Sequence, residues 1–234
     1  MTILRLPISA SQAIVGSIVG VGLATGHVNW TGLGKVVLCW LATPIGAMLI
    51  SCIIYLLLDL IIRGVPMSML TRDKILWSGL VLVGTYASYA LGANNVANAT
   101  GIFSGLVGMT DQQLGLLGGA AIALGVMTYS RRVMMTVGSG VMRLEAFTAL
   151  VAVSSMALTV HAFALIGVPV STSHAIIGAI VGIGIMRGAH LVRFRILRNI
   201  AYGWLLTPIV SFILAAAGYA LFSGPTSMLG MLLR

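Results

Sequence analysis

Long apolar stretches dominate the chain, and short segments between them carry most of the charge. Only 7% of the residues are charged, whereas a soluble domain carries about 25%. Because about 20 apolar residues cross a bilayer as a helix, this pattern predicts an all-α integral membrane protein with several spans, located in the cell membrane. The stretches lie at about 8–26, 34–62, 75–91, 93–108, 114–129, 146–166, 169–186 and 199–222.

The basic residues indicate topology rather than nucleic-acid binding. The net charge is +9, but the clustered arginines and lysines lie between apolar stretches, as is typical of cytoplasmic loops. The four acidic residues form no cluster suited to acid–base catalysis or metal binding, so we expect neither an enzyme nor a nucleic-acid-binding protein. The basic clusters are Arg63, Arg72 and Lys74; Arg131, Arg132 and Arg143; and Arg187, Arg193, Arg195 and Arg198.

An asparagine-rich segment lies between two of the apolar stretches and contains Asn94, Asn95 and Asn98. Amide side chains are costly against lipid, but they are tolerated where a broken helix is buried in protein or lines a cavity. If all basic clusters are cytoplasmic, the three apolar stretches between the first and second clusters do not give an even number of crossings. We therefore predict that 75–108 is one broken element, or a span followed by a re-entrant turn.

The chain contains an internal repeat. Residues 7–22 read PISASQAIVGSIVGVG and residues 169–184 read PVSTSHAIIGAIVGIG. The match resumes as WLATPI from residue 40 and WLLTPI from residue 204. Chance similarity between apolar segments would not preserve Pro-x-Ser-x-Ser followed by spaced glycines. Duplicated halves with broken helices around a common site are typical of secondary transporters.

The two halves of the repeat are unequal. The asparagine-rich segment precedes Pro169, and its counterpart in the first half would lie before Met1. We therefore expect a helical bundle with broken or re-entrant helices and an inverted repeat whose first half is incomplete. The predicted division is a remnant of the first repeat at 1–62, a basic cytoplasmic loop at 63–74 and a complete second repeat at 75–234.

The repeated motif offers a site for an oxyanion. Pro169 suits a first helical turn, and the three hydroxyls that follow would then surround the free N–H groups of a helix N-terminus, which favours anions. The alternative is that these hydroxyls only cap the helix. Two related copies that face a common midplane favour a site. The hydroxyls belong to Ser171, Thr172 and Ser173 in the second copy, and to Ser9 and Ser11 in the first.

The amides and the histidine of these motifs suggest a second kind of site. Amide oxygens suit a small cation and amide N–H groups suit an oxyanion, although asparagines also join helices by hydrogen bonds. His174 occupies the position that Gln12 holds in the first copy. We expect a neutral, hydrogen-bonding role for this histidine, with a response to pH as the alternative.

The remaining features have structural interpretations. The small-xxx-small spacing of Gly16 and Gly20, which recurs in the second copy, predicts close helix packing. Asp59 is expected to pair with an arginine one turn later on its helix. Glu145 is expected to pair with Arg143 at the membrane interface.

These motifs resemble those of the inorganic phosphate transporter (PiT) family of cation-coupled permeases. GANNVANATG at 92–101 is similar to that family's GANDVANA signature, and PVSTSHAIIGAIVG to its P-x-S-T-T-H-x-x-x-G element. TVG at 136–138 and AF at 146–147 also resemble stretches of family members. The resemblance implies an inverted-repeat transporter in which two Ser/Thr-rich elements hold phosphate between the halves, while the asparagine motif helps to bind sodium or handle protons.

The resemblance also implies which residues form the site. The phosphate-binding group comprises Ser9, Ser11, Asn94, Ser171, Thr172 and Ser173, and the cation-binding or coupling group comprises Gln12, Asn95, Asn98 and His174. The chain departs from the family pattern in three ways. Asn95 replaces the aspartate of GAND, the first Ser/Thr-rich element has one hydroxyl fewer, and the first GAND-like element is missing.

The functional hypothesis is a symporter that moves inorganic phosphate, driven by a sodium or proton gradient, through alternating access around a midplane site. The alternatives are a sulfate permease of the same family, and a non-transporting or split-gene membrane subunit whose partner carries the missing motif. No cofactor is expected apart from a possible bound sodium ion. The expected partners are phosphate or sulfate, Na⁺ or H⁺, the lipid bilayer, and either further copies of the chain or a partner subunit.

Overall fold

The computed structural model describes residues 9–135, 141–142, 144–188 and 192–223, without the side chains of residues 129, 130 and 132–134. The described residues are almost all helical, as the composition predicts. The α-helices are α1 (Ala10–Thr25), α2 (Trp30–Gly64), α3 (Met69–Leu91), α4 (Ala97–Thr100), α5 (Asp111–Met135), α6 (Ala146–Leu165), α7 (Thr172–Arg187) and α8 (Phe194–Phe222).

Within the part of the chain that the structure describes, four elements are long and apolar enough to cross a membrane: α2, the composite element Met69–Phe103, α6 and α8. In contrast, α1 and α7 have 16 residues each. At 1.5 Å per residue each measures about 24 Å, which is less than the hydrocarbon thickness of about 30 Å. Both short helices therefore reach only part of the way across, as expected for the broken elements of a transporter-like repeat.

The asparagine-rich segment belongs to one continuous element. Helix α3 passes into a π-helix, η2 (Gly92–Val96), then into α4 and a final 3₁₀ turn, η3 (Gly101–Phe103). The backbone stays in the right-handed helical region at Leu91, Gly92 and Ala97. The prediction of a single broken element is confirmed, and the alternative of a re-entrant turn is not. The break is a widened helical turn, a distortion that is frequent at functional sites.

Each short helix packs against the long helix of the other repeat, so the two repeats interleave. A methyl group at Gly16 of α1 would collide with the backbone of Pro208 in α8, and one at Gly178 of α7 with the backbone of Pro44 in α2. Gly16 and Gly178 are equivalent positions of the repeat, as are Pro44 and Pro208, so the same helix crossing occurs twice. The prediction of close glycine packing is confirmed. The two repeats of the sequence do not form two separate bundles, because helices of one pack on helices of the other.

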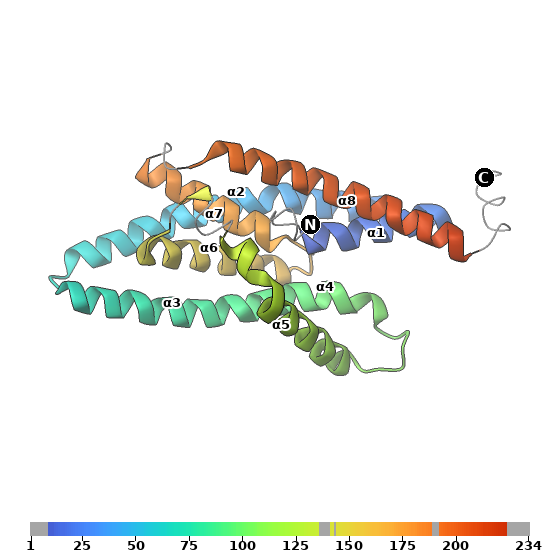
Figure 1. Ribbon diagram of the computed structural model, residues 1–234, viewed down its shortest axis with the longest axis horizontal. Coiled ribbons are helices and arrows are strands. Elements are labelled where there is room, and N and C mark those ends of the chain that lie inside the picture. The colour runs from blue at the N-terminus through green and yellow to red at the C-terminus, as the bar shows by residue number, and fades with distance from the viewer. Residues whose placement is uncertain (1–8, 136–140, 143, 189–191, 224–234) are drawn as a thin grey trace.

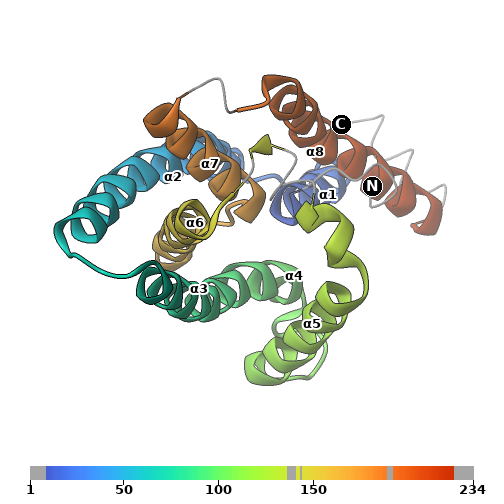
Figure 2. The same cartoon turned by 60° about the vertical axis from the view of Figure 1, so that its left-hand side comes forward.

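Helix α6 is the centre of the bundle, because it packs on α2, α3 and α7. Figure 1 shows α3 and α4 running end to end on one side of α6, with α2 and α7 on the other. The second view shows α8 beside α1, and α5 diverging from α4 (Figure 2). The buried core combines Val151 and Val160 of α6 with Ile180 and Ile183 of α7.

The basic ends of the helices agree in part with the predicted topology. Arg63 in the last turn of α2 pairs with Asp59 at 2.8 Å, as predicted. The connection to α3 spans only residues 65–68, so Arg72 and Lys74 lie on α3 and most of the predicted basic loop is helical. The reason is a helix cap, because the hydroxyl of Ser68 accepts a hydrogen bond from the N–H of Thr71 and starts α3 early.

The interfacial ion pair predicted for Glu145 involves a different arginine. Its carboxylate pairs with Arg187 at the end of α7, at 3.2 Å. Arg143, the predicted partner, lies outside the described residues, as does the TVG motif at 136–138. The observed pair links the start of α6 to the end of α7, two helices that pack against each other.

Candidate functional site

Helices α1 and α7 begin with the same cap. The hydroxyl of Ser9 accepts a hydrogen bond from the N–H of Gln12 at 3.2 Å, and that of Ser171 accepts one from the N–H of His174 at 3.3 Å. Both serines are buried. The capping interpretation is therefore confirmed for these two residues. Each helix still directs free N–H groups and the positive end of its dipole toward the interior.

Asn94 of the π-helix holds the segment that leads into α7. Its amide donates to the carbonyl of Val170 at 2.8 Å and accepts from the N–H of Val170 at 3.3 Å. Only 3% of Asn94 is exposed. This two-way contact fixes the backbone of residue 170. Because Ser171 caps α7 at Thr172, Pro169 precedes the cap and does not occupy the first helical turn as expected.

Asn98 extends the same network to the first repeat. Its amide donates to the hydroxyl of Ser11 at 3.1 Å, and Ser11 in turn donates to the carbonyl of Val170 at 2.7 Å. The amide of Asn94 also donates to the side-chain oxygen of Asn95 at 2.9 Å. The broken helix, the start of α1 and the segment before α7 therefore meet at one carbonyl group, that of Val170.

A proline in α2 explains how His174 is held. Pro44 has no N–H, so the carbonyl of Trp40, four residues earlier, lacks its usual helical donor. Nδ1 of His174 lies 3.1 Å from this carbonyl, and because a carbonyl only accepts, Nδ1 carries the proton. The Trp40 indole donates to the carbonyl of Pro169 at 3.1 Å. Trp40 thus holds α7 on both sides of its cap, and His174 has the hydrogen-bonding role that the sequence predicts.

Two equivalent side chains have buried polar atoms without a hydrogen-bond partner in the described structure. These atoms are Oε1 of Gln12 and Nε2 of His174. Gln12 is 5% exposed and His174 is 4% exposed, so each atom is an unused acceptor beside a helix N-terminus. Buried polar groups normally find a partner, and a bound ion or water can supply one.

The structure brings all the predicted site residues to these two N-termini and the broken helix between them. Ser173 lies within hydrogen-bond distance of the Ser171 hydroxyl, at 2.8 Å, and it is half-buried like Thr172. The predicted residues include no aspartate, glutamate, lysine or arginine. An anion bound here would be held by hydroxyls, amides and helix N-termini.

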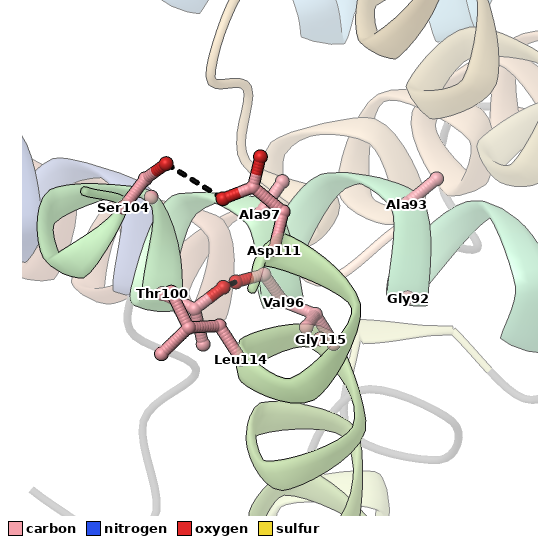
Figure 3. Close-up of a pocket in the computed structure, with 10 residues that line it drawn as sticks. Gly92, Ala93, Val96, Ala97, Thr100, Ser104, Asp111, Leu114 and Gly115 are labelled. Carbon is pink, nitrogen blue, oxygen red and sulfur yellow. Dashed lines mark hydrogen bonds between the residues drawn. The ribbon is translucent and has the colours of Figure 1, made fainter. Parts of the chain in front are cut away.

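The opposite face of the broken helix lines a separate recess of about 390 Å³. Figure 3 shows Gly92, Ala93 and Thr100 on one wall and Asp111 of α5 on the other. The hydroxyl of Ser104 donates to the Asp111 carboxylate at 2.6 Å. None of the predicted site asparagines lines this recess. The broken helix therefore has one face toward the starts of α1 and α7 and another toward α5.

Sequence reasoning missed two contributors to the site. Val170 acts through its backbone, which every residue shares, so no sequence signal marks it. Trp40 did have a signal, because a proline four residues after a tryptophan occurs in both copies of the repeat and frees the tryptophan carbonyl in each.

Comparison with known proteins identifies the family. The model of the phosphate transporter family matches residues 1–80 and 65–215. The chain belongs to the phosphate transporter family. Among the relatives, a protein of Methanocaldococcus jannaschii named as a phosphate permease is 30% identical, over 90% of this chain and 67% of its own length. A Rhizobium meliloti protein named as a low-affinity inorganic phosphate transporter is 31% identical, over 92% of this chain and 67% of its own.

A solved structure has the same fold. "The sodium-dependent phosphate transporter" superposes with a TM-score of 0.82 at 24% identity, covering 94% of this chain and 74% of that chain. The expectation of an all-α, multi-pass membrane bundle is thereby confirmed. The phosphate transporter resemblance drawn from the GANN and PVSTSH motifs is confirmed as well.

Proposed function

We propose that this chain carries inorganic phosphate across the cell membrane as a secondary active symporter. The observation that carries this proposal is the convergence of both repeats on Val170 through Ser11, Asn94 and Asn98. Two capped helix N-termini face this point, and such termini favour tetrahedral oxyanions. Membership of the phosphate transporter family favours phosphate, and the names of the relatives cited above mention phosphate, so the sulfate alternative gains no support.

The proposed phosphate ligands are the hydroxyls of Ser9, Ser11, Ser171, Thr172 and Ser173, together with Asn94. Asn94 already uses its amide on Val170, so its main proposed role is to position the start of α7. Because the proposed ligands include no lysine or arginine, phosphate would be bound loosely enough to leave again. Relative motion of the repeats would then expose it on either side of the membrane.

The coupling ion is proposed to be sodium or a proton. The solved relative is named as sodium-dependent, which favours sodium. The neutral oxygens of Asn95, Asn98 and Gln12 suit a sodium ion, although Asn95 supplies no charge. His174 offers an unused nitrogen, and a proton there is the alternative. No catalytic role or organic cofactor is proposed.

Uptake into proteoliposomes tests this proposal. The purified chain is reconstituted, and radiolabelled phosphate uptake is measured with an inward sodium gradient, with an inward proton gradient, and with neither. We expect uptake only with one of the gradients, and a loss of at least tenfold for Asn94→Ala. Asn199→Ala, which removes an exposed asparagine of α8, is the matched control and should leave uptake unchanged.

Three results would change the proposed function. Uptake at the same rate without any gradient would contradict symport. Uptake that excess sulfate blocks and excess phosphate does not would contradict phosphate as the substrate. If uptake required a second membrane protein carrying an asparagine-rich broken helix, the split-subunit alternative would replace a lone transporter.

A further inference from the structure

An apolar groove separates α8 from α2 and α7. It has a volume of about 270 Å³ and includes Pro44 and Met48 of α2, Ile177 and Val181 of α7, and Ala201 of α8. Helix α8 packs chiefly on α1, and α7 on α2 and α6. The groove is therefore a seam between two groups of helices, and its lining residues are apolar apart from the indole of Trp204, at one end.

The direction of the groove follows from the helices that line it. Along α8, the lining residues Leu197, Ala201 and Trp204 recur at helical spacing and so share one face. The Trp204 ring packs on His174 at the start of α7, with ring centroids 3.9 Å apart. The groove thus runs from the level of the α7 N-terminus toward the end of the bundle where α7 finishes and α8 begins.

Arginines begin α8 at that end of the groove, and Arg193 lies one helical turn before the lining residue Leu197. Arg193, Arg195 and Arg198 lie at the start of α8 and are exposed, and none of them has an acidic partner among the residues that the structure describes. From Trp204 to Arg193 the helix rises about 16 Å. This matches the hydrocarbon depth of one leaflet, about 15 Å. The length of α8 from Trp204 to the arginines therefore matches the length of one acyl chain.

We propose that this groove binds one anionic phospholipid of the cytoplasmic leaflet. One acyl chain lies along Met48, Val181 and Ala201, and the headgroup phosphate pairs with the arginines that begin α8. A zwitterionic phospholipid has the same chains but no net negative charge, so it gains less from the arginines. This site is distinct from the proposed phosphate site, and its test does not depend on transport.

Native mass spectrometry of the whole chain tests the proposal. The protein is equilibrated with equal amounts of phosphatidylglycerol and phosphatidylcholine, and the lipid retained after detergent removal is counted. We expect one retained phosphatidylglycerol per chain. Replacing the three arginines by glutamine should reduce its preference over phosphatidylcholine by at least tenfold, since each charge near the membrane is worth about fivefold. Arg72→Gln with Lys74→Gln, on α3, is the charge control.

A second pair of variants tests the groove itself. Ala201→Phe fills the groove and should abolish retention of either lipid, whereas Ala217→Phe, which adds the same side chain to α8 away from the groove, should not. Folding of each variant is checked by its helical circular dichroism. Equal retention of the two lipids by the native chain, or full retention by Ala201→Phe, would overturn the proposal. Displacement of the lipid by inorganic phosphate alone would also overturn it, because the arginines would then be an anion site.

Discussion

At the scale of single residues, the site is organised by two backbone carbonyls. Those of Val170 and Trp40 accept hydrogen bonds from Asn94, Ser11 and His174. The sequence could predict the caps, because a serine just before a helix commonly accepts a hydrogen bond from the backbone N–H two or three residues later. It could not predict Val170, whose role depends on which segments meet there.

The hydrogen bonds between Asn94 and Val170 predict that Asn94→Ala lowers the free energy of unfolding. Asn94→Ala leaves a buried carbonyl and a buried N–H of Val170 with weaker or no partners, and we expect the free energy of unfolding to fall by about 1–3 kcal/mol. Denaturant titration in detergent measures this change. Asn199→Ala is exposed and should stay within about 0.5 kcal/mol of the native chain. Equal stability of both variants would contradict the described contact.

The hydrogen bond from His174 to the Trp40 carbonyl predicts a second effect on stability. His174→Leu removes its donor, and should destabilise the chain by about 1–3 kcal/mol. His174→Gln restores an N–H group and uses the residue that the first copy has at this position, so we expect it to recover most of the loss. Thermal unfolding of the three proteins provides the comparison. A leucine variant as stable as the glutamine variant would show that the histidine does not act through this carbonyl.

At the scale of elements, the sequence predicts where helices break and pack closely, but not the form of the break or the partner. The asparagines at 94–98 predict an interruption, and the structure turns it into a π-helix within a continuous element. The glycine spacing predicts a close crossing, yet it does not say that Gly178 meets Pro44 of the other repeat. Partners of this kind depend on the whole arrangement of helices.

The crossing at Gly178 can be tested against a glycine with free space. A Cβ at Gly178 collides with the Pro44 backbone, whereas one at Gly46 in α2 meets nothing within 4 Å. We expect Gly178→Ala to cost about 1–3 kcal/mol through overpacking. Gly46→Ala should be neutral or stabilising by up to about 1 kcal/mol, because alanine favours a helix. Equal effects, measured by denaturant unfolding, would argue against the crossing.

At the scale of the whole molecule, the basic residues and the broken element together predict one topology. The ends of α2 and α7 and the starts of α3 and α8 carry arginines or lysines, as cytoplasmic ends do. A single crossing by Met69–Phe103 removes the extra span that the apolar stretches alone would give. The interleaving of the repeats could not be predicted, since the repeat itself is compatible with two separate bundles.

Cysteine labelling tests this topology. With Cys39 and Cys52 replaced by alanine, single cysteines are introduced as Pro66→Cys before α3 and Val107→Cys after η3. Because one element joins the two positions, we expect a membrane-impermeant thiol reagent to reach them from opposite sides of the membrane. Labelling of both from the same side would mean that the element turns back within the bilayer.

In the proposed function, both repeats present a tetrahedral oxyanion site at the N-termini of α1 and α7. The most direct test is a crystal structure with arsenate, whose arsenic gives an anomalous signal and whose shape matches phosphate. We expect one anomalous peak within hydrogen-bond reach of the N-termini at Ser9 and Ser171, and we expect Asn94→Ala to weaken it. A peak in the recess beside Asp111 or at the arginines of α8, with none between the two helix N-termini, would contradict it.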